Sequence, residues 1–396
     1  MAAIESGRHA PPRTFFLNDP VIRGVFYQIV VAVLVVGFLV WIVNNTAANL
    51  AAQNKTTGFD FLWKTAGFDI SFTLFPWDRT SFYWQAFLAG LTNTILVAVI
   101  GIIFATILGF TIGIARLSSN YLVSRLATVY IETIRNIPLL LQLFFWYFAV
   151  LKAMPAVRDS IALPFDTFIN QRGLFVPKPL VDDQFTFVWI ALLVGIVIWF
   201  LLKRWAKARL ETSGKRFPVF LAGLGIVILL VAVTWMASGA QMTFEPPVLN
   251  RFNFKGGVEL PPELVALAFG LTIYTAAFIA ETVRGGIQSV SHGQTEAAQA
   301  LGLKDGDRLR LVIVPQAMRV IIPPLTSQYL NLTKNSSLGA AIGYPELVNV
   351  FTGTTLNQTG RAIEVIALTM LVYLTLSLTT SAIMNWYNAR VALVER

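Results

Sequence analysis

The chain has 396 residues, of which 56% are hydrophobic and 13% are charged. A soluble globular protein has about 45–50% apolar and about 25% charged residues, so the composition excludes an ordinary soluble protein. The net charge of +9 does not indicate a nucleic-acid partner, because the Lys and Arg residues flank long apolar stretches, as in membrane proteins.

The sequence contains no cysteine, and its two histidines are His9 and His292. Without cysteine there can be no disulfide, cysteine-ligated metal or thiol catalysis. Only two histidines, both outside the apolar stretches, do not favour a histidine metal site. No G-x-x-x-x-G-K-[ST] motif occurs, so a phosphate-binding loop is absent. We therefore expect no metal and no cofactor in this chain.

Apolar stretches of about 20 residues, the length that crosses a bilayer, recur along the chain. They lie at 25–43, 86–114, 126–151, 186–202, 218–236, 264–288, 316–334 and 362–388. The first is too long for the core of a signal peptide and no cleavage site follows it, so it is expected to be an uncleaved helix. The sequence thus predicts an all-α polytopic membrane protein with about eight transmembrane helices.

The positions of Lys and Arg predict the orientation of these helices. Cytoplasmic loops of membrane proteins are enriched in both residues, and the densest cluster lies at 203–217. This rule places that loop, both termini and residues 293–315 in the cytoplasm. The outer loop 44–85 is rich in Phe, Trp and Tyr, and for it we favour anchoring at the membrane–water interface over ligand binding.

Two charged pairs fall within the predicted spans. Glu132 and Arg135 lie in the third span, and Glu281 and Arg284 near the end of the sixth. Each pair is spaced i,i+3, and both glutamates lie about 10 Å from the cytoplasmic end of their span, so the four groups can meet. Charges in a membrane mark pairing or function. A charge network that locks helices or forms a gate is favoured over a substrate site.

Polar residues near the outer half of the membrane are a second candidate site. Residues 331–343 place polar side chains beside small residues, which suits a broken helix that lines a pathway. The alternative, that this is the polar end of a span at the interface, stays open. The candidates for the pathway are Asn136, Lys334, Asn335, Ser336 and Glu346.

Residues 293–315, between two apolar stretches, are polar and charged. Ser291 can cap a short helix with Glu296 in its first turn, and Gly302 can end it with a positive φ. Asp305 can cap a second helix that begins near Asp307. We expect a compact knob with a small apolar surface for another protein, formed by Ala297, Ala298, Ala300 and Leu301.

The spacing of Glu296-Ala297-Ala298, Gly302 and Pro315 resembles the coupling loop of bacterial ABC importer permeases. Val312 and Val314 replace the isoleucine and leucine of that pattern. Segments 129–145, 277–287 and 322–347 resemble helices of the polar amino-acid permeases, the histidine/glutamine-type subfamily. The extended layout resembles the longer permease subunits of general L-amino-acid or glutamate/glutamine/aspartate/asparagine importers.

The resemblance implies a five-helix permease core with additions. The implied parts are 1–85 (an extra helix and an aromatic-rich periplasmic loop), 86–151 (first part of the core), 152–263 (an inserted block with two extra spans) and 264–396 (second part of the core, with the coupling loop at 291–315). It also implies the residues that couple to the ATPase, namely Glu296, Ala297, Ala298, Leu301, Gly302 and Asp305.

The implied function is import of polar L-amino acids across the bacterial inner membrane by alternating access. The implied partners are a second related permease, two ATPase subunits that bind ATP and Mg, a periplasmic amino-acid-binding protein and membrane lipid. An ion-coupled secondary transporter that acts alone is the alternative, with Glu132, Glu281 and Glu364 as proton or sodium sites. Such a carrier needs no coupling loop, so the loop favours the permease.

Overall fold

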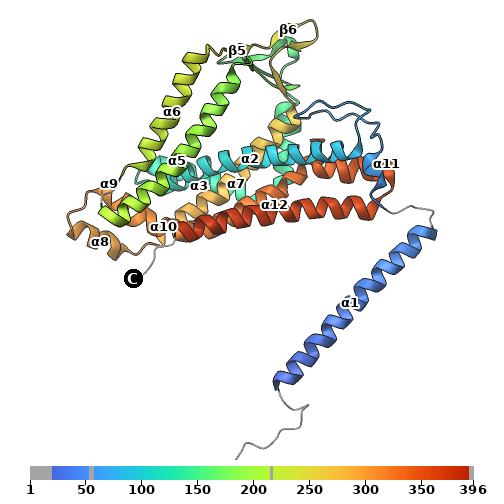
Figure 1. Ribbon diagram of the computed structural model, residues 1–396, viewed down its shortest axis with the longest axis horizontal. Coiled ribbons are helices and arrows are strands. Elements are labelled where there is room, and N and C mark those ends of the chain that lie inside the picture. The colour runs from blue at the N-terminus through green and yellow to red at the C-terminus, as the bar shows by residue number, and fades with distance from the viewer. Residues whose placement is uncertain (1–19, 53–57, 215–216, 392–396) are drawn as a thin grey trace, which may run out of the picture.

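The computed structural model describes residues 20–52, 58–214 and 217–391. In this part of the chain, seven helices are long and apolar enough to cross a membrane, and one bent pair makes an eighth candidate. The prediction of a helical polytopic membrane protein is therefore confirmed (Figure 1). The long helices are α1 (Pro20–Ala52), α2 (Tyr83–Arg116), α5 (Phe185–Ser213), α6 (Val219–Ser238), α7 (Pro262–Gln288), α10 (Val314–Asn335) and α12 (Ala362–Val391).

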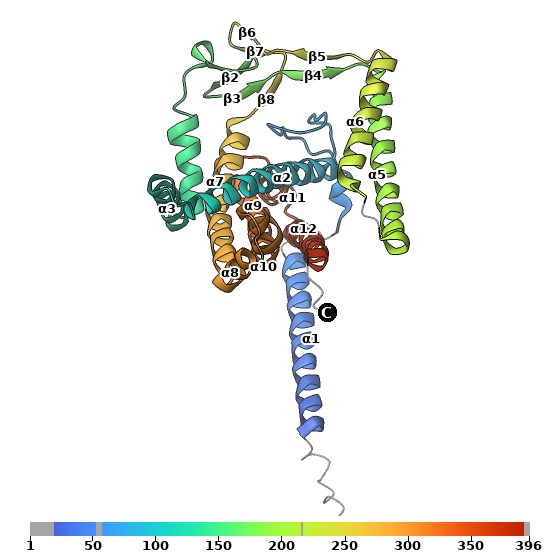
Figure 2. The same cartoon turned by 90° about the vertical axis from the view of Figure 1, so that its left-hand side faces the viewer.

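Short helical segments join or extend the long helices. They are η2 (Asp60–Trp63), α3 (Tyr121–Asn136), α4 (Leu139–Phe144), η3 (Phe145–Leu151), η4 (Val157–Asp159), α8 (His292–Ala300), α9 (Asp305–Arg308), η5 (Leu309–Ile313), η6 (Ser336–Ile342), η7 (Val348–Thr355) and α11 (Leu356–Thr359). Helix α1 stands apart from the other helices, and none of its most apolar stretch is buried (Figures 1 and 2).

Helices α2 and α7 form the central pair, and glycine lets them approach closely. A Cβ added at Gly109 would lie 2.6 Å from the Cβ of Ile279, and one added at Gly113 would lie 2.6 Å from the carbonyl oxygen of Ala280. Any larger side chain at these two positions would force the helices apart. Small residues at helix contacts are the usual means of close packing in membranes, where burial of apolar surface gives little driving force between helices.

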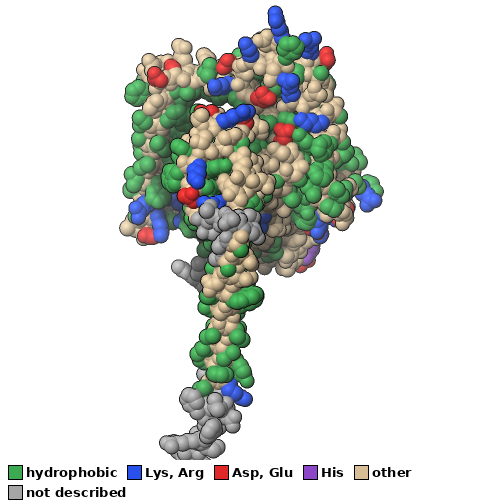
Figure 3. All heavy atoms as spheres, turned by 90° about the vertical axis from the view of Figure 1, so that its right-hand side faces the viewer, with side chains coloured by type: hydrophobic (Ala, Val, Ile, Leu, Met, Phe, Trp, Pro, Cys, Tyr) green, Lys and Arg blue, Asp and Glu red, His purple; other side chains and the backbone are tan. Residues whose placement is uncertain are grey.

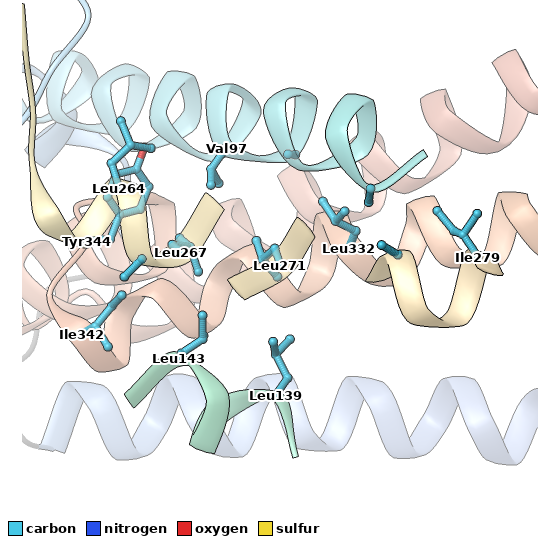
Figure 4. Packing of buried hydrophobic residues seen from close by; sticks show 14 of the residues in the cluster. Val97, Leu139, Leu143, Leu264, Leu267, Leu271, Ile279, Leu332, Ile342 and Tyr344 are labelled. Carbon is cyan, nitrogen blue, oxygen red and sulfur yellow. The ribbon is translucent and has the colours of Figure 1, made fainter. Parts of the chain in front are cut away.

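The core lies between α2, α7, α10 and α4. Figure 4 shows its apolar side chains, among them Val97 from α2, Leu143 from α4, Leu267 and Leu271 from α7 and Leu332 from α10. All five are fully buried. The segment that separates α4 from α7 adds Tyr147 and Leu151 of η3 to this core, and Ile169 and Leu260 of the strands pack against it.

The third predicted span is sharply bent. Asn120 caps α3, because its side-chain oxygen accepts hydrogen bonds from the backbone N–H groups of Leu122 and Val123. The helix ends at Asn136 because Ile137, which precedes Pro138, is extended, as residues before proline prefer. The chain continues as α4 and η3 at an angle of 105° to α3. The predicted span 126–151 is therefore two helices.

The segment between η3 and α7 contains eight short strands that the sequence analysis left as loops. They are β1 (Ile161–Leu163), β2 (Thr167–Asn170), β3 (Gly173–Val176), β4 (Lys178–Val181), β5 (Met242–Glu245), β6 (Val248–Asn250), β7 (Asn253–Lys255) and β8 (Val258–Leu260). They pair antiparallel as a sheet in the order β1-β2-β3-β8 and as the ribbons β4-β5 and β6-β7. We call this layer the platform. Figure 2 shows it bridging the ends of α4 and α7 and the α5–α6 hairpin.

The α5–α6 hairpin extends from one end of the platform, at the edge of the molecule (Figure 2). Helix α5 continues to Ser213 and ends at Gly214, whose φ of 66° is left-handed. Most of the basic segment 203–217, predicted as a loop, is therefore the last three turns of α5. The four-part division of the chain stays a prediction, although the platform and this hairpin both lie within the predicted inserted block.

Candidate functional site

A hollow lies where the predicted polar segment meets α12. Its volume is about 530 Å³, and it is lined by Lys334, Ser337, Val348, Thr352, Ile366, Thr369, Met370, Tyr373, Leu374 and Ser377. We call it the α12 groove. Lys334 is exposed there and forms no ion pair with any described residue. A hollow of this size, with hydroxyl groups and one cation on an apolar wall, is suited to a small polar ligand with a carboxylate.

Glu346 lies directly behind one wall of the α12 groove and is fully buried. Its carboxylate accepts hydrogen bonds from the backbone N–H groups of Val348 and Asn349, each at 2.7 Å, and so caps η7. The hydroxyl of Tyr373, a groove residue, donates to it at 3.0 Å. Glu346 therefore has three donors and positions Tyr373, but it does not line the groove itself.

The other pathway candidates lie elsewhere. Asn335 is half-buried and is not among the groove residues, whereas Ser336 is fully buried and donates to the carbonyl of Thr333 at 2.7 Å. Asn136 lies at the end of α3, where its amide donates to the carbonyl of Glu132 at 2.6 Å. Of the five candidates, the structure places Lys334 in the groove, with Glu346 one side chain away.

A charge network lies where α2, α3 and α7 meet, and its centre is Arg116. The Arg116 guanidinium donates to Glu281 at 2.5 Å and to Glu132 at 3.1 Å. Arg284 donates to both oxygens of Glu281, at 2.5 and 3.0 Å. The side chains of Arg116, Glu281 and Arg284 are between 18% and 27% exposed, whereas that of Glu132 is 55% exposed. Three of the four predicted members thus belong to one network.

Arg135 is the predicted member that does not join. Its guanidinium lies 5.2 Å from the centre of the Phe278 ring, a cation–π contact, and no described residue forms an ion pair with it. The sequence analysis missed Arg116 because this residue follows the predicted span 86–114 and reads as an ordinary flanking cation. Arg116 lies at the end of α2 and faces Glu132 of α3 and Glu281 of α7. This arrangement depends on the packing of the helices, which sequence periodicity does not reveal.

The predicted knob consists of α8, α9 and η5. Helix α8 ends in a Schellman motif, in which Leu303 N–H bonds the carbonyl of Ala298 and Gly302 N–H bonds that of Gln299. The φ of Gly302 is +72°, so the prediction of a helix end at a left-handed glycine is confirmed. Leu301 is 80% exposed at this end, whereas Ala298 is buried. The exposed apolar surface is therefore smaller than predicted.

Two details of the predicted knob were wrong. Glu296 is in the second turn of α8, because the helix begins at His292, and its carboxylate contacts the His292 ring at 3.0 Å. Asp305 is the first residue of α9 and not its cap; it pairs with Arg308 at 2.9 Å, and the capping position is Lys304. Helix α8 begins directly after Ser291, as predicted, although the Ser291 side chain forms no capping hydrogen bond. Helix α9 begins two residues earlier than predicted.

The aromatic outer loop packs in part onto the helices, and its predicted anchoring at an interface stays a prediction. Phe61 is 2% exposed and contacts Tyr83 and Phe351, although Trp63 remains 69% exposed. Asp60 pairs with Arg361 at 2.9 Å, and Gly58 N–H donates to Glu364. We call these two contacts the outer latch, because they fasten the loop to the start of α12.

No group of three or more His, Asp or Glu side chains in the described ranges is arranged to hold a metal ion. Several carboxylates are instead occupied by arginines, lysines, backbone N–H groups or a tyrosine hydroxyl. The site thus consists of three parts: the α12 groove, the charge network and the knob. Helix α7 connects the last two directly, since it contains Glu281 and ends four residues before α8.

Comparison with known proteins identifies the family of the chain. Residues 105–393 match the family described as binding-protein-dependent transport system inner membrane component. The chain is 51% identical to the general L-amino acid transport system permease protein AapQ of Rhizobium johnstonii, over 96% of this chain and 95% of that protein. It is 42% identical to the glutamate/glutamine/aspartate/asparagine transport system permease protein BztB of Rhodobacter capsulatus, over 98% and 99%. Among solved structures, an amino acid ABC transporter crystallised with histidines matches at 20% identity with a TM-score of 0.46, over 78% of this chain and 95% of that one.

Proposed function

The chain belongs to the family of binding-protein-dependent transport system inner membrane components, and we propose that it is the permease subunit of an ATP-driven importer of polar L-amino acids. The observation that carries the proposal is the identity of 51% and 42%, over nearly the whole length, to two permeases whose names give amino acids as cargo. The protein is a multi-pass component of the inner membrane, as its family is.

The proposed assembly has four kinds of partner: a second related permease, two ATPase subunits, a periplasmic amino-acid-binding protein and the surrounding lipid. ATP and Mg belong to the ATPase subunits, because the sequence has no phosphate-binding loop of its own. The ATPase subunits contact the knob through Glu296, Ala297, Leu301 and Gly302. Support comes from the exposure of Leu301 and from the rigid end that the Schellman motif gives to α8.

The proposed mechanism is alternating access driven through α7. Movement of the ATPase subunits displaces α8, and α7 follows because only three residues separate the two helices. The charge network then transmits the displacement, since Arg116 ties α7 to both α2 and α3. At the other end of the core, the α12 groove offers Lys334 to a substrate carboxylate. No covalent bond changes in this chain.

The alternative of an ion-coupled carrier is disfavoured by the surroundings of its predicted ion sites. Glu281 already receives both Arg116 and Arg284, and Glu364 accepts the N–H of Gly58. Glu281 is therefore a poor site for a free proton or sodium ion, because the two arginines stabilise its ionised form without another cation.

The decisive experiment is uptake by the purified complex in proteoliposomes. Radiolabelled glutamate, glutamine and aspartate are supplied outside with the binding protein, and either ATP inside or a proton gradient is the energy source. We expect uptake with ATP and binding protein together, and none with the gradient alone. Uptake driven by the gradient without ATP would refute the proposed function.

A further inference from the structure

The cytoplasmic end of the α5–α6 hairpin has a structure that the transport mechanism does not use. The last turns of α5 carry Lys203, Arg204, Lys207 and Arg209, opposed by a single acid, Glu211, which pairs with Lys207 at 3.9 Å. Lys203 and Arg204 form no ion pair with any described residue. In Figure 3 the hairpin is the column of hydrophobic side chains at the left-hand edge, and Lys and Arg side chains gather at its lower end.

A hollow of about 470 Å³ lies between the two helices directly above these cations. It is lined by Ile196, Trp199, Phe200, Lys203, Val219 and Phe220. Its walls are therefore apolar and aromatic, with one cation at the cytoplasmic end. A hollow that is apolar over most of its length and cationic at one end is complementary to a molecule with an acyl chain and a negatively charged head.

The walls of this hollow are held in place by close packing. A Cβ added at Gly223 of α6 would lie 2.2 Å from the Trp199 ring, so the ring lies flat against the α6 backbone. Gly195 and Val227 meet in the same way one turn away. The Arg204 guanidinium lies 6.0 Å from the centre of the ring of Phe200, a residue that lines the hollow.

The cations around the hollow occupy one face of α5. Lys207 follows Lys203 by four residues and Arg204 adjoins it, so the three lie within about 100° of arc. Arg209 lies about 240° round the helix from Lys203, packed over the Trp205 ring at 5.2 Å. The hairpin thus has a cationic face next to the hollow. Arg209 lies on another face of the same helix end and does not line this hollow.

We propose that this hollow binds one anionic phospholipid, whose phosphate lies between Lys203 and Arg204 and whose acyl chain lies along Trp199, Phe200 and Phe220. Basic side chains next to an apolar groove at the cytoplasmic end of membrane helices are suited to such headgroups. The arginine and lysine donate to the phosphate oxygens, and the rings provide an apolar surface that lipid tails fill. The lipid occupies the face of the hairpin that the rest of the described chain leaves exposed.

Titration of the intact complex with phosphatidylglycerol tests this proposal. The complex with its partner subunits is placed in phosphatidylcholine nanodiscs, and retained phosphatidylglycerol is counted by native mass spectrometry. K203Q and R204Q should each weaken phosphatidylglycerol binding about fivefold, which corresponds to ~1 kcal/mol for each cation lost. R209Q is the matched control, because it removes the same charge from the same helix end outside the hollow, and it should change binding by less than about twofold.

Two further arms separate the sources of the phosphate and the role of the tail. Soluble glycerol 3-phosphate should not displace the lipid, because it lacks the acyl chain, and F220A should weaken retention of phosphatidylglycerol without changing its order of preference over phosphatidylcholine. Equal losses in K203Q and R209Q would overturn the proposal in favour of a diffuse charge effect. Displacement by glycerol 3-phosphate would overturn it in favour of a free-anion site. Cross-linking of F220C to the partner permease would also overturn it, because protein would then cover this face in place of lipid.

Discussion

The guanidinium of Arg116 and the carboxylate of Glu281 are separated by 165 positions in the chain and by 2.5 Å in space. This contact joins the end of α2 to the last turns of α7, next to the knob, and Glu132 brings α3 to the same cation. The end of α7, which we propose moves with the ATPase subunits, is thus tied to α2 and α3 through the side chain of Arg116.

The first prediction concerns this contact. A double-mutant cycle of R116Q and E281Q on the free energy of unfolding of the purified complex should give a coupling of about 1–3 kcal/mol, as for hydrogen bonds between charged groups. The value is below the 3–5 kcal/mol lost on breaking a fully buried pair, because both side chains retain some solvent contact. The same cycle between Arg135 and Glu281 is the control and should give less than about 0.5 kcal/mol. Equal couplings would show that Arg116 is not the centre of the network.

The second prediction concerns the end of α8. G302V should impose a β-branched residue at φ +72°, at a cost of about 1–2 kcal/mol, and should reduce transport-coupled ATP hydrolysis while the complex still assembles. Steric crowding is not the cause, because no atom lies within 4 Å of a Cβ placed there. G293V is the matched control, since Gly293 has equally open space within α8 and an ordinary helical φ. Normal coupling in G302V would exclude a role for this helix end.

The third prediction concerns the α12 groove. K334M should leave assembly and ATPase binding intact but slow the uptake of glutamate and aspartate more than that of glutamine or arginine, because the lost cation attracts a side-chain carboxylate. Initial uptake rates in proteoliposomes measure this ratio. K178M on β4, an exposed lysine of the platform, is the control. Unchanged ratios and rates in K334M would make Lys334 an anchor at the interface.

The fourth prediction concerns the outer latch. R361Q removes a guanidinium that is 7% exposed and should increase hydrogen exchange over residues 58–67. R79Q breaks the exposed pair with Asp69 in the same loop and should not. The pKa of Asp60 is lowered from its ordinary 3.8, first by its hydrogen bond with Lys64 and further by Arg361. The Asp60 carboxylate is therefore ionised at neutral pH. The stability that its pair with Arg361 contributes is lost only as the pH falls from the ordinary pKa of the group through the lowered one. Equal exchange in both variants would contradict the latch.

The fifth prediction concerns orientation. The chain has no cysteine of its own, so a single introduced cysteine can be labelled without background. S213C, at the end of α5, should resist an impermeant reagent added to intact spheroplasts, because the cation-rich end of a span faces the cytoplasm. F165C on the platform is the control; Phe165 is 90% exposed and should label readily. The reverse pattern would invert the proposed orientation.

The sequence predicts the spans well because a run of about 20 apolar residues has few other uses. It also predicts Gly302, because few helix ends other than a left-handed glycine fit that pattern. The bend at Pro138 was foreseeable as a break in backbone hydrogen bonding, but its angle of 105° depends on how α4 packs against Leu267 and Leu271 of α7.

The strands of the platform escaped prediction because each is only three or four residues long and several are exposed on both faces. Such strands show no alternation of apolar and polar residues, which is the signal that sequence analysis requires. The charge network was predicted in part for a related reason. Spacing places Glu132, Glu281 and Arg284 on helix faces, but which cation meets them is decided by the crossing of α2 over α7.

That crossing limits how the core can move. With Gly109 against Ile279 and Gly113 against the Ala280 backbone, the ridges of α7 fit into α2 without clearance. Sliding one helix along the other would drive side chains into backbone, so the pair resists shear. Helix α7 is about 40 Å long, from the platform to the knob. We therefore expect the two helices to tilt together as one rigid unit, so that a small rotation at the knob becomes a sideways displacement of the platform at the other end of α7.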